Sequence, residues 1–391
     1  MFFSRRQGTK AVLVLAEVLL TVMIAAGAVA QVPAGRAEIL ERKVICKEPG
    51  RYIGWPTITR LRSGRLVVAF SGERDEHVCP WGVTQLVWSD DEGASWSRPV
   101  TVNNTPLDDR DAGVLETSRG TLLVSWFTSL AFADSSLLSK HPGWRRHLSK
   151  IGPLTREKWL GSWVRRSTDG GKTWGPPIRT HVSAPHGPIQ LRDGRLLYVG
   201  IGKVDTQKVI GVDVSADDGK TWKLLTTIQI APGDTIDYFW EPHVVELRSG
   251  KLVAMFRYEP KQRDDCHLRQ AESTDGGRTW TVAHATPIWG YPPHLLELRN
   301  GWLLVSYGRR KEPFGERACL SRDGGETWDT AHEIALSSAI LEGGGGDMGY
   351  PSSVQLPDGS IWTVYYEVDR PGEKPSLMGT HWRLVLPGNE R

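Results

Sequence analysis

Apolar residues along the chain come in short runs that are joined in pairs by a glycine-containing turn. Each pair has an apolar run, a turn such as Ser-Gly or Asp-Gly, and a second run rich in Val, Leu and aromatic residues. This is the pattern of a β-hairpin. The pattern predicts six hairpins, over residues 56–72, 113–127, 187–202, 243–257, 294–308 and 352–367.

A polar phrase of the form Ser-x-Asp-x-Gly-x-[Ser/Thr]-Trp follows all but the last of these hairpins. Its copies are SDDEGASW at 89–96, STDGGKTW at 167–174, SADDGKTW at 215–222, STDGGRTW at 273–280 and SRDGGETW at 321–328. The Gly permits a tight turn, the Asp can accept backbone N–H groups, and the Trp can wedge between neighbouring sheets. Calcium or sugar binding by these turns is the alternative. Repeated copies of a structural fastener explain the pattern more simply than repeated copies of a site.

A repeat of roughly fifty residues is typical of propellers and other arrays. Six units of about four strands predict an all-β, six-bladed β-propeller over residues 36–388. Either the segment 39–47 or the residues after 376 would complete the last unit and close the ring, which removes exposed sheet edges. Residues 128–166 form an insertion in the second unit, for which we expect one or two short helices over the site face, as a lid, a wall or a surface elaboration.

Residues 1–30 have the features of a secretory signal peptide: a basic start, an apolar stretch, and Ala-Val-Ala before Gln31. An uncleaved membrane anchor is the alternative. Removal of this segment takes away three basic residues and one acidic residue, so a formal charge of +3 becomes +1. We therefore expect a secreted or periplasmic monomer with no nucleic-acid partner and no stable membrane contact after cleavage.

The four cysteines, Cys46, Cys79, Cys266 and Cys319, lie in different units, so no pairing is evident. The chain has no CxxC and no HExxH motif. We predict neither a metal site nor a cofactor.

One face of a propeller collects the residues that precede each first strand and the loops between second and third strands. The strand starts lie at 52–56, 108–113, 184–188, 240–243, 290–294 and 347–353, and polar loops at 72–82, 257–270 and 308–320. Arg, Asp, Glu, His and Tyr converge there. A solvated loop face is the alternative, but aromatic and His residues beside buried strands favour a functional pocket.

The polar phrase is the Asp-box, or BNR repeat, and residues 40–385 resemble the sialidase (neuraminidase) superfamily of six-bladed propellers. The resemblance implies that Tyr350 is the nucleophile and Glu241 its base, and that Arg257 and Arg317 bind a substrate carboxylate. A neutral phenol suits an anomeric centre that bears a carboxylate, and it needs a neighbouring base because its pKa is high. Arginine forks bind carboxylates in bidentate fashion.

The sequence departs from the family at the first blade, where the first clamping arginine is replaced by Gly54. Arg51, Arg74 and Arg110 are the available substitutes. For the general acid we prefer Asp75, and Asp111 is the rival.

Further predicted substrate-binding residues are His77, His186, His243, Tyr291 and His294. Several His on one face indicate a polar sugar subsite or a different route of proton transfer. We expect a secreted exo-glycoside hydrolase that cleaves a terminal acidic sugar, sialic acid or a related one, from glycans. A polysaccharide lyase or His-dependent glycosidase acting on uronate-containing glycan, and a non-catalytic carbohydrate-binding propeller, are the alternatives.

Overall fold

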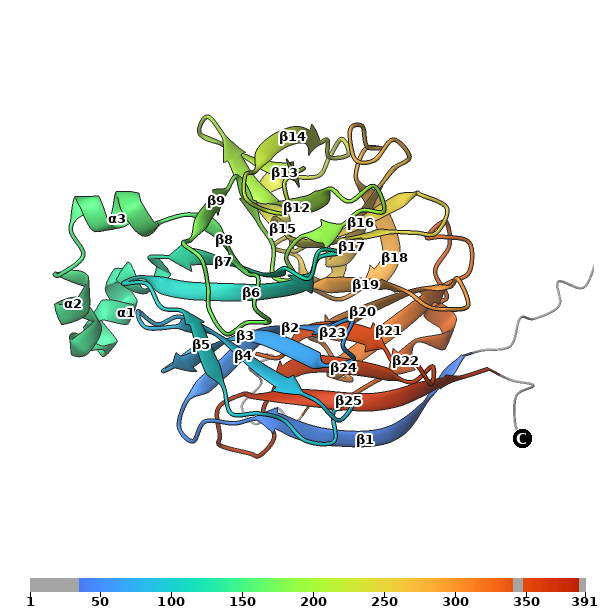
Figure 1. Cartoon of the computed structure of the whole chain (residues 1–391), viewed down its shortest axis with the longest axis horizontal. Helices are drawn as coiled ribbons and strands as arrows, with labels where there is room; N and C mark the ends of the chain where they lie inside the picture. Colours follow the sequence, from blue (N-terminus) through green and yellow to red (C-terminus); the bar gives the residue numbers. More distant parts are fainter. Residues whose placement is uncertain (1–34, 340–346, 387–391) are drawn as a thin grey trace, which may run out of the picture. The chain divides into compact units, whose positions relative to one another are not determined.

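Six antiparallel sheets make up the computed structural model, which describes residues 35–339 and 347–386 (Figure 1). The first blade contains β2 (Tyr52–Arg60), β3 (Leu66–Arg74), β4 (Val83–Ser89) and β5 (Val100–Asn103). The second contains β6 (Asp108–Glu116), β7 (Leu122–Ser129), β8 (Ser162–Ser167) and β9 (Ile178–Thr180). The third contains β10 (Val182–Ser183), β11 (Ile189–Gln190), β12 (Leu196–Val204), β13 (Gln207–Ser215) and β14 (Lys223–Ile228). In this third blade the innermost strand is split into β10 and β11, which both pair with β12.

The fourth blade contains β15 (Phe239–Glu246), β16 (Leu252–Tyr258), β17 (His267–Ser273) and β18 (His284–Trp289). The fifth contains β19 (Pro293–Glu297), β20 (Leu303–Arg309), β21 (Gly315–Ser321) and β22 (Ile334–Ala335). The sixth contains β23 (Gly349–Gln355), β24 (Ile361–Glu367), β25 (Ser376–Val385) and β1 (Arg36–Cys46). Strand β1 pairs with β25 from Arg36↔Val385 to Cys46↔Leu377, and the two lie side by side in Figure 1. The N-terminal strand and the residues after 376 therefore complete the last blade together. The six-bladed propeller is confirmed.

Apolar side chains from adjacent blades form the core. One cluster joins the first and second blades through residues such as Val67 and Val124, and another joins the fourth and fifth through Met255 and Val305. Clusters of the same kind lie at the other blade junctions. Burial between sheets, rather than within one sheet, holds each blade in place.

The Asp-boxes connect the third and fourth strands of their blades and are internally satisfied. In the second blade, Asp169 Oδ1 accepts from the backbone N–H of Thr173 at 2.9 Å, and Oδ2 accepts from its hydroxyl at 2.6 Å. The Ser167 hydroxyl donates to Asp169 and accepts from the N–H of Gly171 at 2.9 Å. The other four boxes repeat the Ser–Asp and Asp–Ser/Thr contacts. These networks support the interpretation of the boxes as fasteners.

The tryptophans of the Asp-boxes pack against the interblade clusters, as expected, but most are only partly buried. Trp328 is the most buried of them, at 9% exposed, and its indole N–H donates to Gln270 Oε1 of the neighbouring blade at 2.9 Å. Each box therefore holds its own turn and also contacts a neighbouring sheet.

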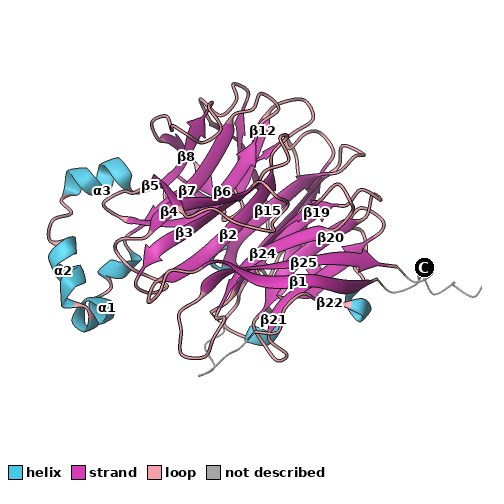
Figure 2. Cartoon of the chain, turned by 60° about the horizontal axis from the view of Figure 1, so that its bottom comes forward, coloured by secondary structure: helices cyan, strands magenta, loops and turns pink. Residues whose placement is uncertain are grey.

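The insertion in the second blade contains three short α-helices, α1 (Ser135–Lys140), α2 (Pro142–Leu148) and α3 (Pro153–Trp159), after a 3₁₀ turn, η1 (Ala131–Ala133). This is more than the one or two helices predicted, because Pro142 and Pro153 each begin a new helix. Figure 2 shows the helices at one side of the strands. Phe132 and Trp144 of the insertion pack against Cys79 in the loop between β3 and β4.

All four cysteines are buried free thiols. Within the described residues, the structure contains no helix that is both long and apolar enough to cross a membrane. The predicted signal peptide, residues 1–30, lies outside the described part of the chain.

Candidate active site

Four of the innermost strands carry a bulge at the same place, each with one non-glycine residue at positive φ. These residues are Trp55 (56°), Asp111 (53°), Glu241 (46°) and Tyr350 (57°). The register of each first strand shifts at this point. A left-handed conformation costs a non-glycine residue on the order of 1–3 kcal/mol, and such strain gathers at functional sites. Bulges in four blades therefore mark these side chains as a candidate site.

Tyr350 and Glu241 meet across the site, although they belong to different blades. The Tyr350 hydroxyl donates to Glu241 Oε1. Arg257 Nη1 donates to Glu241 Oε2 at 2.6 Å and to the Tyr350 oxygen at 3.3 Å. Tyr350 is 3% exposed, and burial, together with the charge of Glu241, raises its pKa well above the ordinary value. The structure thus brings together three residues that the resemblance singled out.

Arg257 is neutralised by two carboxylates. Besides Glu241, it contacts Glu259 through Nη2 and through Nε at 3.1 Å. Its guanidinium lies 4.4 Å from the centre of the Tyr291 ring, and the Tyr291 hydroxyl donates to Glu259 Oε1 at 3.1 Å. Arg257 therefore has little capacity left for a substrate carboxylate in this arrangement.

Arg310, which the sequence analysis did not select, occupies the other side of Tyr350. Its guanidinium lies 5.9 Å from the centre of the Tyr350 ring and 5.3 Å from that of Tyr291. It donates to the Met348 carbonyl at 2.9 Å and to the Tyr366 hydroxyl at 3.3 Å. Its position just after β20 matches that of Arg257 near the end of β16, which is the sequence signal that could have identified it.

Arg317 lies elsewhere. Its guanidinium donates to the carbonyls of Ser337 at 2.7 Å and Pro313 at 2.9 Å, and it lies 3.6 Å from Glu333. These partners belong to the loops around β21 and β22, so Arg317 is not brought to Tyr350. The reason is that it follows the turn into β21, and its side chain is held by the backbone of its own blade.

Asp111 lies near enough to Tyr350 and Glu241 for their charges to interact. It is 6% exposed, and burial raises its pKa to about 7, with Arg110 opposing the rise and Glu241 adding to it. Its Oδ1 atom has no hydrogen-bond partner among the described residues. A buried acceptor without a partner is costly, which agrees with the raised pKa of this carboxyl group.

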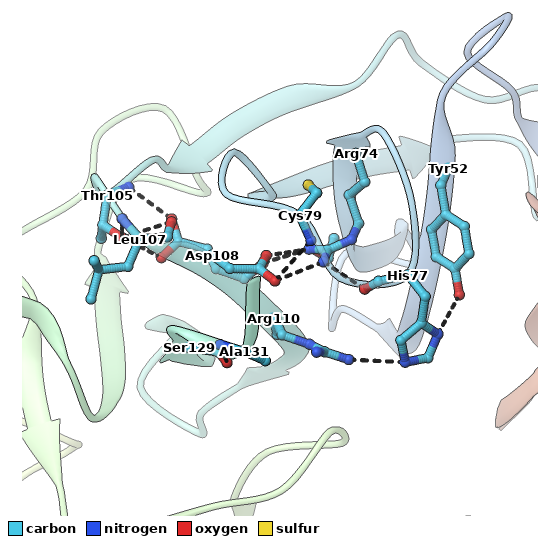
Figure 3. A network of polar contacts seen from close by, with 12 residues as sticks. Tyr52, Arg74, His77, Cys79, Thr105, Leu107, Asp108, Arg110, Ser129 and Ala131 are labelled. Atoms are coloured by element: carbon cyan, nitrogen blue, oxygen red, sulfur yellow. Dashed lines mark hydrogen bonds and ion pairs between the residues drawn. The ribbon is translucent and has the colours of Figure 1, made fainter. Parts of the chain in front are cut away.

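His77 lies in a polar network at the rim of the site (Figure 3). Its Nδ1 atom is 3.1 Å from Asp347 Oδ1 and 3.1 Å from the Tyr52 hydroxyl, and its Nε2 atom is 3.2 Å from Arg110 Nη2. Arg110 also lies 4.4 Å from the centre of the Trp55 ring. Asp347 was not selected from the sequence, although it lies three residues before Tyr350 in a segment expected at the site face.

Two other residues of the first blade's loop are engaged away from the nucleophile pair. Arg74 is fully buried and binds Asp108 with both Nη atoms, at 2.7 and 2.9 Å (Figure 3). Asp75 pairs with Arg51 and accepts from the indole N–H of Trp81 at 2.6 Å. Arg74 therefore cannot replace the missing arginine without breaking a buried ion pair, and Asp75 and Arg51 are engaged with each other.

Tyr52 occupies the space beside Gly54, where the resemblance to sialidases led us to expect an arginine. A Cβ atom at Gly54 would lie 2.9 Å from Tyr52 Cε1, closer than side chains normally approach. The Tyr52 hydroxyl donates to Asp347 Oδ1 at 3.0 Å. A tyrosine bound to an aspartate thus lies where the resemblance predicts an arginine.

His186, His243 and His294 form a buried cluster rather than a polar rim. The rings of His243 and His294 stack at 4.3 Å, and that of His186 meets them edge-on at 5.4 and 4.9 Å. Burial lowers the pKa of all three, that of His243 to about 3, so they are neutral at physiological pH. The described residues contain no group of His, Cys, Asp or Glu arranged to hold a metal ion. These His therefore pack as core residues.

Comparisons with known proteins agree with this architecture. A crystal structure of a protein of unknown function from Dyadobacter fermentans superposes with a TM-score of 0.74 at 24% identity, over 89% of this chain and 99% of that one. A Hadza microbial sialidase gives 0.60 at 18% identity, over 86% of this chain and 66% of that one. The α-L-arabinanase of Penicillium chrysogenum gives 0.59 at 15% identity, over 88% and 98%.

At these identities the likeness concerns the fold alone, which sialidases and arabinanases share. A search of curated proteins returns no match. The family model of the BNR repeat-like domain matches residues 142–363, which is more than half of the chain. The chain therefore belongs to the BNR repeat-like domain family and is a six-bladed propeller structurally similar to sialidases.

Proposed function

We propose that the protein is an exported exo-glycoside hydrolase of the sialidase type that removes a terminal acidic sugar from a glycan. The observation that carries this proposal is the contact between the Tyr350 hydroxyl and the Glu241 carboxylate, with Arg257 bound to both. A phenol buried this deeply is a weak nucleophile, so it needs an adjacent base. Glu241 is placed to take the phenol proton while the oxygen attacks the anomeric carbon.

Arg257 supports this pair without acting on the substrate. By donating to both oxygens it holds the carboxylate in line with the phenol, and its positive charge stabilises the phenolate that develops during attack. Glu259 fixes the guanidinium from the other side. The side chain of Arg257 thus orients the nucleophile and its base as one unit.

The acidic substrate is supported by two guanidinium groups that form no ion pair with the described residues. Arg310 bonds to a backbone carbonyl and a phenol, and Arg110 bonds to an imidazole. Arg74 and Arg257, by contrast, are paired with carboxylates. Unpaired arginine forks beside a catalytic pair match the geometry of a substrate carboxylate. We expect Arg310 to make this contact, because it lies against Tyr350.

The remaining polar groups fit the hydroxyls of a sugar. The free Oδ1 atom of Asp111 can accept a hydroxyl, and burial of the site makes such a bond selective, since a ligand without that hydroxyl leaves the oxygen unpaired. Because Tyr52 stands at Gly54, the acidic group is not held as in a complete arginine triad. The proposal therefore covers sialic acids and uronic acids, with a glycan as partner and export by residues 1–30.

The test uses the full mature chain and 4-nitrophenyl glycosides of N-acetylneuraminic acid, glucuronic acid and glucose. We expect release of 4-nitrophenol from an acidic glycoside only. Tyr350→Phe should lower kcat/KM by about 10³-fold or more, which corresponds to ~4 kcal/mol of transition-state stabilisation. Tyr365→Phe is the matched control, because this buried tyrosine of the same blade bonds to Thr380.

Four results would contradict the proposal. Hydrolysis of the glucoside alone would remove the acidic substrate. An ultraviolet-absorbing unsaturated uronate would identify a lyase instead of a hydrolase. Full activity of Tyr350→Phe would exclude the phenol as nucleophile, and glycan binding without turnover would indicate a carbohydrate-binding propeller.

A further inference from the structure

His77 and Asp347 form a dyad that joins the first and last blades, 270 positions apart in the sequence. Asp347 Oδ1 is 3.1 Å from His77 Nδ1 and also accepts from the hydroxyls of Tyr52 at 3.0 Å and Tyr366 at 2.7 Å. Burial opposes ionisation, but the bond from His77, the bond from Tyr366 and the charge of Arg310 lower the pKa of Asp347 to about 2. Asp347 is therefore a carboxylate that fixes the imidazole and stabilises its protonated form.

His77 lies nearer to solvent than the nucleophile does. Its side chain is 42% exposed, whereas Tyr350 is 3% exposed. The centre of the His77 ring lies 5.0 Å from that of Trp55, and the centre of the Tyr350 ring lies 6.3 Å from it. The indole of Trp55 therefore contacts both rings. In an exo-acting hydrolase the terminal sugar enters the pocket and the leaving group extends toward solvent. A proton donor to that leaving group belongs at the rim, where His77 is.

The second nitrogen of His77 is under the control of Arg110. Arg110 Nη2 lies 3.2 Å from His77 Nε2, and because a guanidinium only donates, Nε2 accepts and the ring proton sits on Nδ1. Arg110 has no ion-paired carboxylate within the described part of the chain. A substrate anion held by Arg310 would also attract Arg110, whose guanidinium then leaves Nε2 free to take a proton from solvent before the reaction begins.

Resting on the proposed function, we propose that His77, positioned by Asp347, is the catalytic group that protonates the departing glycosidic oxygen, and that Arg110 restrains it until an acidic substrate binds. The groups that face His77 are Tyr52 from β2, Arg110 from β6 and Asp347 ahead of β23. Asp75 is engaged with Arg51, so it does not compete for this role.

The steps balance as a double displacement. In the first, the Tyr350 oxygen bonds to the anomeric carbon while Glu241 takes the phenol proton; the glycosidic C–O bond breaks, and the oxygen leaves with the proton from His77 Nε2. In the second, His77 Nε2 takes a proton from water, whose oxygen bonds to the same carbon. The bond to Tyr350 breaks, and the phenolate recovers its proton from Glu241. The net reaction consumes one water.

The experiment compares good and poor leaving groups on the acidic sugar that the full mature chain hydrolyses, as its 4-nitrophenyl and benzyl glycosides. His77→Gln should lose on the order of 10²–10⁴-fold in kcat/KM on the benzyl glycoside. Nitrophenolate needs little protonation, so its release should fall less than about tenfold, as expected from the same acid–base principle. Asp347→Asn should show the same leaving-group dependence as His77→Gln with a smaller loss on the benzyl glycoside, because the imidazole loses the carboxylate that orients it.

His141→Gln is the matched control, since this partly exposed imidazole stacks on Trp144 and faces Glu76 outside the site. It should change neither substrate. Equal losses on both glycosides in His77→Gln, or no loss, would overturn the inference, as would the leaving-group dependence appearing in Asp111→Asn instead. If the unmodified enzyme hydrolyses neither acidic nitrophenyl glycoside, the proposed function has failed, and this outcome is distinguished from failure of the His77 assignment.

Discussion

Substitution of Asp111 by Asn should stabilise the protein at neutral and alkaline pH while it impairs activity. The carboxyl group is buried with a raised pKa of about 7, and its Oδ1 atom has no partner in the described residues. Asn has the same shape, carries no charge, and tolerates positive φ better than most residues. The change therefore removes the cost of ionisation without altering the packing around φ = 53°.

The magnitude follows from the linkage between proton binding and folding. An unfolded aspartate titrates near 3.9, so between about pH 4 and 7 the folded chain holds more protons than the unfolded chain. Stability consequently falls as pH rises through this window and levels off above it. A difference of about three pKa units corresponds to at most ~4 kcal/mol at pH 8 and to almost nothing below pH 4.

Urea denaturation at pH 4 and pH 8, followed by fluorescence, measures this effect as the difference between Asp111→Asn and the unmodified chain. Asp109→Asn is the matched control. Burial raises the pKa of Asp109 to about 7 as well, but its oxygens accept from Asn103 at 2.9 Å and from Thr105 at 2.8 Å. Losing an acceptor there should cost stability at pH 4, and at pH 8 this cost should offset part of the gain from removing the charge, so Asp109→Asn should gain less than Asp111→Asn. A pH-independent difference for Asp111→Asn would refute the argument.

Three other predictions concern recognition, packing and acid stability. Arg310→Lys should weaken kcat/KM for the acidic glycoside by about 1.5–3 kcal/mol, whereas Arg317→Lys should leave it unchanged; the reverse order would restore the sequence-based choice. Trp328→Ala should lower the urea-derived unfolding free energy by about 3–5 kcal/mol without changing kcat of the folded enzyme. Because the pKa of His243 is lowered to about 3, the unfolding free energy should decrease as the pH is lowered below roughly 6.5. This decrease should be smaller in His243→Gln, and equal decreases in the two proteins would contradict the prediction.

Local chemistry made the architecture predictable from the sequence. Each Asp-box holds its turn with groups at most four residues apart, so Ser167, Asp169 and Thr173 specify one another without help from the rest of the chain. The hairpin turns and the alternation of their strands are local in the same sense. Tyr350, Glu241 and Arg257, which were selected from the sequence, also lie in contact in the structure. They do so because all three lie at strand ends that a propeller collects on one face.

Contacts between blades were not predictable in this way. Arg310 lies just after β20 and Arg317 lies in β21 of the same blade. Only Arg310 reaches Tyr350, because the direction of each side chain depends on the loop between β20 and β21 and on the next blade. His77 meets Asp347 only after the ring closes. Gly54 leaves room for the Tyr52 ring, and this steric relation could not be predicted from the two residue types alone.

The sequence by itself therefore determined the six blades, their fasteners and the face on which chemistry gathers, since these follow from turns and strand periodicity within about fifty residues. Only the tertiary structure decided which charges are neutralised and which remain free. Arg74 is paired with Asp108 in the core, whereas Arg110 and Arg310 are not. The reason is physical: the state of a charged side chain is set by burial and by partners a few ångströms away, and those partners come from other blades.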